Sequence, residues 1–225
     1  MRPVLRVLMA VAVVATLAAV PGTAEETAAT VETLYLHGAQ TVGEIETPDT
    51  LLTAYRRMSA TPPTTADSKS TQVVNYVRGP NTKCSGNGLV PTWEANLDGT
   101  LSGPATVTLN TAAIPGSTMT VRLFSDVARN SCNEAYVAPI AEQTVNVPVG
   151  QGETVVTFDA VNALVENNLV LMLSAPDTNV KVPENPSPAQ PFAHTRVFYD
   201  GAAAASRVQF GCTPTQLAAT TCIVE

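Results

Sequence analysis

The sequence predicts an all-β protein in which two antiparallel sheets, with about nine or ten short strands in total, pack face to face. Charged residues make up only 14% of the 225 residues, and Thr, Ser, Ala, Asn and Pro replace them, a composition that favours strands and turns. Several short segments alternate apolar and polar residues, as expected of strands with one buried face. Gly and Pro separate these segments at the spacing typical of a β-sandwich.

The first strand is expected at residues 33–37, followed by a turn or two of helix at 49–58. Residues 59–68 contain two adjacent prolines and no apolar periodicity, which indicates a surface linker or a long crossing loop. Residues 160–166 are the other place where a helical turn is expected. The remaining strands are predicted at residues 72–77, 93–97, 105–109, 118–124, 144–149, 154–158, 168–173, 195–199 and 207–210.

Glycines mark the predicted turns. Asp98-Gly99 is expected to turn the chain with Gly99 at positive φ. Pro115-Gly116 separates segments 105–109 and 118–124, which form the clearest predicted strand pair, and Gly150-Gln151-Gly152 is expected to be a tight connection. The predicted core contains Leu109, Val121, Leu123, Val155, Phe158, Leu171, Leu173, Val197 and Phe210.

The N-terminus predicts export. Arg2 and Arg6 precede a largely apolar stretch at residues 7–20, and Gly22 and Ala24 are small residues suited to a cleavage site. The apolar stretch is shorter than the roughly 20 residues that a membrane helix needs. We therefore expect a cleaved secretory signal and a secreted protein that has no membrane association after cleavage.

These observations divide the chain into three parts. Residues 1–24 are the expected signal peptide, 25–70 an N-terminal extension with a Pro/Thr-rich linker, and 71–225 the β-sandwich domain.

The chain contains four cysteines, Cys84, Cys132, Cys212 and Cys222. An even number in an exported protein predicts disulfides. Of the three pairings we favour Cys84–Cys132 with Cys212–Cys222, because the last two are close in sequence and would staple the C-terminal tail. A zinc site is disfavoured because the sequence has no C-x-x-C pair.

Charge and motifs exclude several functions. A net charge of −7 and a pI near 4.8 argue against a nucleic-acid partner. The sequence contains no G-x-S-x-G elbow, H-E-x-x-H motif or phosphate-binding loop, so we expect no enzyme. Two catalytic alternatives stay open: a Ser/His/Asp set built from His37 or His194 with Asp200, and a carboxylate pair of Glu94 with Asp126.

Residues 126–134 are the candidate calcium site. Asp126, Asn130, Asn133 and Glu134 supply carboxylate and amide oxygens, which calcium prefers. The alternative, which we favour, is a solvated turn in which Asp126 and Asn133 bond their own backbone.

The aromatic residues suggest where a ligand would bind. Trp93 alternates with Ala95 and Leu97, which favours burial over a sugar-stacking role. The candidate ligand-binding residues are Tyr76, Tyr136, Tyr199 and His194, although a buried tyrosine with a bonded hydroxyl is the commoner case.

The segment WEANLDGTLSGPATVTL at 93–109, followed by MTVRLFSDV at 119–127, resembles the jelly-roll β-sandwiches of the galactose-binding-like group. It is similar to accessory domains of secreted bacterial peptidases and X-Pro dipeptidyl peptidases. The resemblance covers residues 71–212. It implies a non-catalytic jelly roll that binds carbohydrate, positions a substrate or is stabilised by calcium.

Together these patterns predict a secreted, non-catalytic binding module for an extracellular polysaccharide, a cell-wall polymer or a protein. The alternative is a structural or self-assembling cell-surface protein that uses a sheet edge or face as its interface. A third possibility is a hydrolase whose site forms only in three dimensions. The sequence predicts no oligomeric state.

Overall fold

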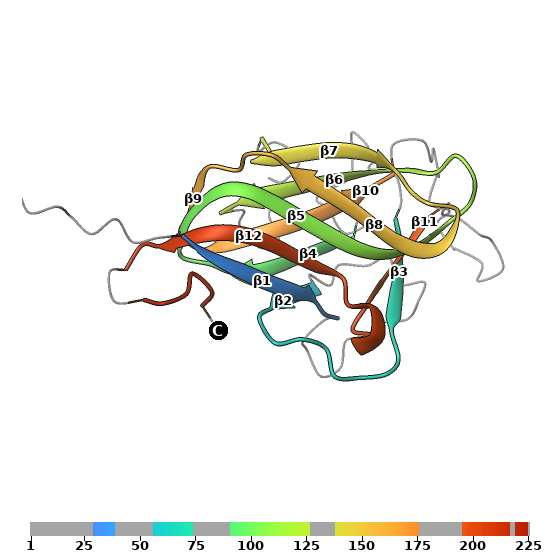
Figure 1. Cartoon of the computed structure of the whole chain (residues 1–225), viewed down its shortest axis with the longest axis horizontal. Coiled ribbons are helices and arrows are strands. Elements are labelled where there is room, and N and C mark those ends of the chain that lie inside the picture. The colour runs from blue at the N-terminus through green and yellow to red at the C-terminus, as the bar shows by residue number, and fades with distance from the viewer. Residues whose placement is uncertain are drawn as a thin grey trace, which may run out of the picture.

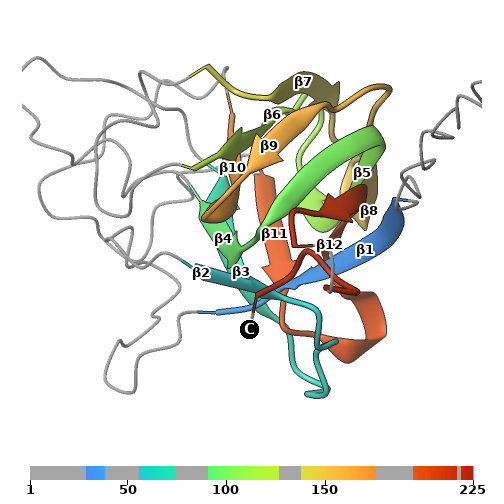
Figure 2. The ribbon, with the colours of Figure 1, turned by 90° about the vertical axis from the view of Figure 1, so that its left-hand side faces the viewer.

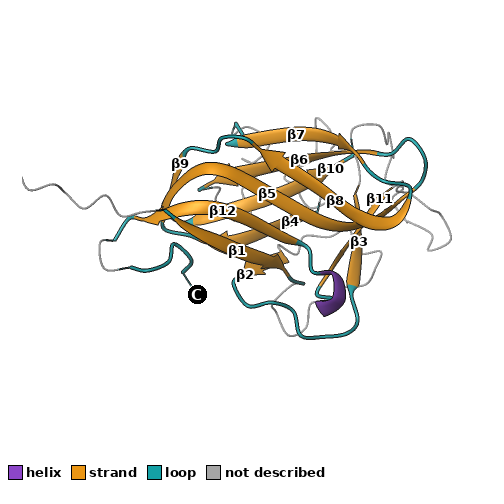
Figure 3. Cartoon of the chain, viewed as in Figure 1, coloured by secondary structure: helices purple, strands orange, loops and turns teal. Residues whose placement is uncertain are grey.

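The computed structural model describes residues 29–38, 56–73, 91–126, 138–175, 195–216 and 219–224. Its regular structure is β throughout these residues, apart from one 3-10 turn, η2 (Ala202–Ala204) (Figure 3). Twelve strands form one continuous hydrogen-bonded sheet, so the predicted all-β class is confirmed.

The long strand β5 (Gly99–Ala113) is the axis of one half of this sheet. Every strand pair in this half is antiparallel. One side of β5 pairs first with β12 (Arg207–Pro214) and then with β11 (Thr195–Tyr199), and the other side pairs with β8 (Gly150–Phe158) and β9 (Ala163–Val165). Beyond these, β1 (Thr30–Leu36) pairs with β12 and β3 (Lys69–Val73) pairs with β11. We call these seven strands the β5 half.

The second half runs in the order β4 (Thr92–Asn96), β10 (Asn168–Ser174), β6 (Thr118–Ser125) and β7 (Ala141–Asn146), and we call it the β10 half. Strand β2 (Arg56–Ser59) joins the halves, because it pairs antiparallel with β1 and parallel with β4. The β5 half lies in front of the β10 half in Figure 1, and the two are seen side by side in Figure 2.

The central core lies between the halves and takes the inward side chains of both. Trp93 is completely buried there, as its alternation predicts. Eight of the nine predicted core residues are buried, and the prediction for Val155 is wrong because its side chain is 55% exposed. Strand β8 turns Thr154, Val156 and Phe158 inward. Val155 and Phe158 are an odd number of positions apart, so a regular strand cannot bury both on one face.

Two predicted connections are wrong. Segments 105–109 and 118–124 do not pair with each other, because β5 pairs within one half and β6 pairs with β10 and β7 in the other. The Pro115-Gly116 turn itself is confirmed, with Gly116 at φ 80°. Gly99 has no positive φ and begins β5. A Cβ there would overlap Sγ of Cys222 and lie 2.7 Å from Sγ of Cys212, so close packing against sulfur requires glycine.

Both predicted helical turns are replaced by strands where the structure describes them. Residues 56–58 belong to β2, and 163–165 form β9. In each case pairing with a neighbour decides the conformation: Arg56 lies opposite Trp93, and Val165 opposite Gly99. Residues 49–55 lie outside the described residues.

The predicted extension at 25–70 contributes described strands to the sheet. Strand β1 pairs with β12 over six residues, and β2 joins the halves. The loop at 60–68 crosses between β2 and β3 and is bonded at Thr65, whose hydroxyl donates to the Asp200 carbonyl at 2.6 Å. In the described part of the chain, no helix has the length and apolar character needed to cross a membrane.

Candidate functional site

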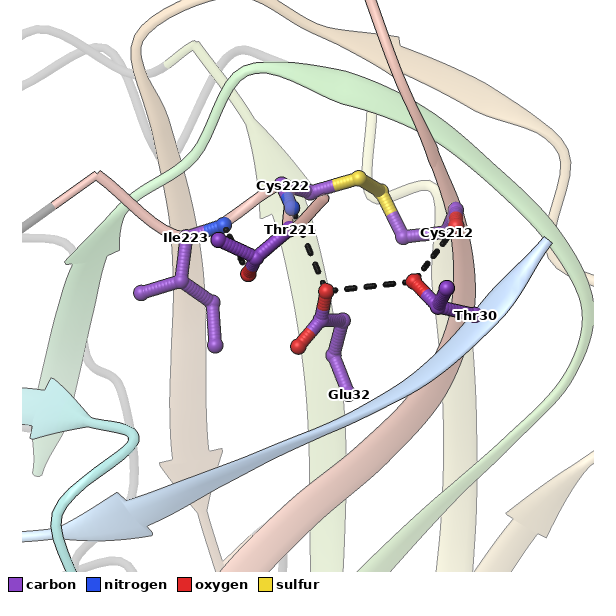
Figure 4. Close-up of a disulfide and its surroundings, with 6 residues drawn as sticks. All are labelled: Thr30, Glu32, Cys212, Thr221, Cys222 and Ile223. Atoms are coloured by element: carbon purple, nitrogen blue, oxygen red, sulfur yellow. Dashed lines mark hydrogen bonds between the residues drawn. A yellow bond between two sulfur atoms is a disulfide. The ribbon is translucent and has the colours of Figure 1, made fainter. Parts of the chain in front are cut away.

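A disulfide fixes the C-terminal segment to the sheet. Cys212 in β12 is bonded to Cys222, which confirms that part of the predicted pairing (Figure 4). The segment after the disulfide lies beside β4, where Ile223 bridges to Leu97, and the amide of Asp98 donates to the Cys222 carbonyl at 2.9 Å. The disulfide therefore ties the tail, which lies along the β10 half, to a strand of the β5 half.

The Glu32 carboxylate supports this staple from β1. Its Oε1 accepts the amide of Cys222 at 3.2 Å (Figure 4). The Thr30 hydroxyl lies 3.2 Å from both Glu32 Oε1 and the Cys212 carbonyl, and both of these atoms accept its single proton. These hydrogen bonds link β1 to both cysteines of the disulfide, which indicates a structural role for the disulfide.

Several predicted site residues lie outside the described residues. These are Tyr76, Cys84, Asn130, Cys132, Asn133, Glu134, Tyr136 and His194. The Cys84–Cys132 pairing, the calcium site and three of the four ligand-binding residues therefore stay predictions.

Asp126 directly follows β6 and holds the turn between β9 and β10. Its Oδ1 accepts the backbone amides of Glu166 and Asn167 at 2.9 and 2.8 Å. The residue has φ 54°, in the left-handed region that Asp tolerates better than most side chains. Among the described residues no group of three or more potential metal ligands comes together. Strand β10 lies between Asp126 and the buried Glu94 of β4, the other member of the predicted carboxylate pair.

Tyr199, one of the predicted ligand-binding residues, is buried instead, because its side chain is only 2% exposed. Its ring packs edge-on against Trp93, with centroids 5.7 Å apart. The Arg56 guanidinium lies 5.3 Å from the Trp93 ring and 5.5 Å from the Tyr199 ring, and donates to the Thr71 hydroxyl at 3.1 Å. This cation–π cluster packs the joining strand β2 onto both halves.

His37 and Asp200 form a close, partly buried pair at the end of β1. His37 Nδ1 lies 2.8 Å from Asp200 Oδ1, and Oδ2 accepts the Gly38 amide at 2.9 Å. Lys69 Nζ lies 3.6 Å from Oδ2. Burial alone would raise the pKa of Asp200, but the bonds from His37 and Gly38 and the charges of His37 and Lys69 outweigh it, so the pKa lies below its ordinary value of 3.8.

The second ring nitrogen of His37 shows what this pair does. Nε2 lies 3.0 Å from the Thr61 carbonyl, where a Ser/His/Asp set would need a serine hydroxyl. A carbonyl only accepts a hydrogen bond, so Nε2 donates to it and has no lone pair to take a proton from a nucleophile. In this arrangement the pair clamps the 60–68 loop and the β11–η2 turn to the end of β1.

A mostly polar surface lies on the outer side of the β5 half, and this side of the half faces the viewer in Figure 1. Side chains here alternate with buried ones, as Tyr35 does between Leu34 and Leu36. We call this surface the open face. It includes Thr33, Tyr35, Ser70, Gln72, Thr106, Asn110, Gln151, Glu153, Val155, Thr157, Arg196, Phe198, Arg207 and Gln209.

Strand register places these side chains in rows across the open face. Tyr35 lies opposite Arg207, and Thr33 opposite Gln209, in the β1–β12 pair. Phe198 lies opposite Asn110, in the β11–β5 pair. Ser206 lies where the strand beside β5 changes from β12 to β11. Its hydroxyl donates to the Phe198 carbonyl of β11 at 2.6 Å and accepts the Asn110 amide of β5 at 2.9 Å. Two half-buried aromatic rings therefore lie among amide, hydroxyl and guanidinium groups.

None of these open-face residues was among the predicted site residues. The signal that could have identified them is the alternation that predicted the core, because each lies one position from an inward residue. The alternation does not show which outward positions meet, since that depends on pairing between strands far apart in sequence.

No known protein family and no curated protein matches the chain. Among solved structures it is similar to a CocE/NonD family hydrolase from Staphylococcus aureus, at 10% identity and a TM-score of 0.44, over 83% of this chain and 37% of that one. It is also similar to an aminopeptidase from the marine sediment archaeon Thaumarchaeota archaeon, at 12% identity and a TM-score of 0.48, over 82% and 37%.

An alpha-amino acid ester hydrolase matches at 15% identity and a TM-score of 0.45, over 82% of this chain and 36% of that one. The chain thus spans little more than a third of the length of each of these neighbours. Likeness at this level says nothing about the activity of this chain. The galactose-binding-like assignment stays a prediction.

Proposed function

We propose that the chain is an exported, non-catalytic binding module whose open face binds an extracellular polysaccharide or cell-wall polymer. The observation that carries this proposal is the open face itself. Six strands contribute to it, and its half-buried rings, Tyr35 and Phe198, lie among amide, hydroxyl and guanidinium side chains.

The chemistry of this surface suits a sugar polymer. Sugars present hydroxyl groups around a ring with apolar faces, so a binding surface needs hydrogen-bonding side chains beside aromatic rings. Asn110 and Gln209 supply amides that both donate and accept. A sheet face is rigid and extended, so it can bind several units of a polymer with little ordering cost. The disulfide supports the exported location that the N-terminus predicts.

The test is retention on insoluble polysaccharides and isolated bacterial cell walls. The full chain is produced by export, mixed with each matrix, and the protein left in the supernatant is measured with calcium and with chelator. We expect retention on at least one matrix. The Tyr35→Ala/Phe198→Ala variant should bind about tenfold or more weakly, because each aromatic contact contributes roughly 1 kcal/mol.

The control is Val224→Ala, which removes an apolar side chain that is 51% exposed in the C-terminal segment, where its backbone amide bonds to Asn96 of β4 in the β10 half. It should bind as the wild type does. Equal retention of the aromatic double variant and the wild type would show that the open face is not the site. No retention of the wild type on any matrix would refute polymer binding and leave a protein partner. Loss of binding with chelator would favour the predicted calcium loop.

A second candidate function, self-assembly, is favoured by β8. This strand pairs with β5 over nine residues without a bulge, and its other edge has no partner strand among the described residues. It contains no Lys, Arg or Pro, the residues that commonly protect an edge, and Val155 is 55% exposed. If β8 mediates assembly, wild-type mass in light scattering should rise with concentration, and Val155→Lys should abolish the rise while Ile114→Lys does not.

A further inference from the structure

We infer that the polymer bound by the open face is an acidic glycan, whose carboxylates pair with Arg196 and Arg207. This inference rests on the proposed function and names the chemistry of its ligand. The evidence for it is the charge of the open face, which is positive although the net charge of the whole chain is negative.

The open face is locally basic in an acidic protein. The chain has a net charge of −7, yet the open face as defined carries two arginines and one acid, Glu153. Register separates these charges. Glu153 lies in β8 opposite Asn110, whereas Arg196 and Arg207 lie on the other side of β5, opposite Ala112 and Thr108.

The two guanidinium groups are available to a ligand. Among the described residues, neither arginine has a carboxylate within 4.0 Å. Arg196 is exposed, and Arg207 is half-buried with one bond, from Nη1 to the Ala205 carbonyl at 3.4 Å. A guanidinium carries five N–H donors in a planar fork that matches a carboxylate, so most of the donors of Arg207 remain for a ligand.

Arg122 shows what a structural arginine looks like in this fold. It is half-buried on β6, donates from Nε to Glu142 and from Nη1 to the Ser174 hydroxyl, both at 2.7 Å. Its charge is compensated by an acid directly opposite it in the β6–β7 pair. Arg196 and Arg207 have no such compensation in the described part of the chain.

The arrangement of the two arginines fits an extended ligand. Along the same side of β5, register places Arg207, Phe198 and Arg196 opposite residues 108, 110 and 112. At about 3.4 Å per residue, the two arginine positions are roughly 14 Å apart, with Phe198 between them. A polymer that stacks a sugar on Phe198 can therefore present a carboxylate to each side. Because the rest of the chain is acidic, such a polymer would be repelled except at a local basic surface.

The experiment compares each polymer with its own uncharged form. Polygalacturonate, alginate and isolated bacterial cell walls are used before and after methyl esterification of their carboxylates, with the full chain. We expect at least one untreated matrix to bind at least tenfold more strongly than its ester, and the difference to shrink as salt is raised. Arg196→Gln/Arg207→Gln should bind the untreated matrix as weakly as the wild type binds the ester.

The control variant is Arg122→Gln, which removes one positive charge away from the open face and should leave the binding ratio unchanged. Equal wild-type binding to untreated and esterified forms would overturn the acidic-glycan inference while leaving the proposed function in place. A binding ratio unchanged in the double variant would also overturn it. Absence of binding to these and to neutral polysaccharides would overturn both.

Discussion

The two outward faces of the sheet differ although both are built from strands of the same continuous sheet. The open face of the β5 half is mostly polar and at least partly exposed. The outer face of the β10 half contains Phe124, Val170 and Met172, which are at most 5% exposed yet lie outside the central core. Val170 lies opposite Phe124 and Met172 opposite Arg122, so these side chains form one neighbouring set.

The difference is visible in single strands. In β10, six consecutive residues from Leu169 to Ser174 are buried, whereas β8 alternates exposed and buried side chains from Glu153 to Phe158. A continuous apolar run is typical of a strand buried on both faces, and alternation is typical of a strand with one face in solvent. The comparison indicates that the β10 half contributes to stability through both of its faces, whereas the outer side chains of the β5 half remain available for binding.

The same substitution on the two faces tests this comparison most strongly. Phe124→Ala should lower the free energy of unfolding by about 3–5 kcal/mol, as expected for a buried phenylalanine. Phe198→Ala, on the half-buried open face, should lower it by less than about 1 kcal/mol. Urea denaturation of both variants beside the wild type measures the difference. Similar losses in the two variants would mean that the faces are equally buried in solution.

The alternation of side chains explains why much of the fold could be predicted. Strand β11 matches the predicted 195–199, and Leu171, Leu173 and Val197 are buried as expected, because alternation is a local property of the chain. Partner choice is not local. The hairpin expected around Pro115-Gly116 is replaced by a crossing between the halves, because β5 pairs within the β5 half and β6 pairs with β10 and β7.

The candidate site was less predictable for the same reason. His37 and Asp200 are 163 positions apart, and the sequence offered them as one combination among several. The role of the His37–Asp200 pair depends on the Thr61 carbonyl that contacts His37 Nε2, and no sequence pattern predicts a contact with a backbone group. The open face likewise depends on the register of six strands, although each of its residues is outward by simple alternation.

The junction of the halves gives a smaller test, through Asp200. The backbone amide of His37 donates to the Arg57 carbonyl of the joining strand β2 at 2.8 Å, so the His37–Asp200 pair adjoins the place where the halves meet. Asp200→Asn removes the charge but keeps a side chain that tolerates φ 62°. We expect a loss of about 1.5–3 kcal/mol in the free energy of unfolding, the contribution typical of hydrogen bonds to a charged group. Asp126→Asn is the matched control, because Asp126 also has positive φ and accepts backbone amides, but has no cation bonded to it among the described residues.

The pH dependence separates the charge of Asp200 from its shape. Its pKa is lower in the folded protein than the ordinary value of 3.8, so folding favours the ionised carboxylate. The resulting stabilisation is complete above about pH 4 and is lost as the pH falls through the lowered pKa. The difference between wild type and Asp200→Asn should therefore be largest above about pH 4 and shrink toward zero as the pH falls below that value, measured by urea denaturation at each pH. A difference that stays constant down to pH 3 would mean that packing, and not the charge of Asp200, holds the end of β1 against the β11–η2 turn.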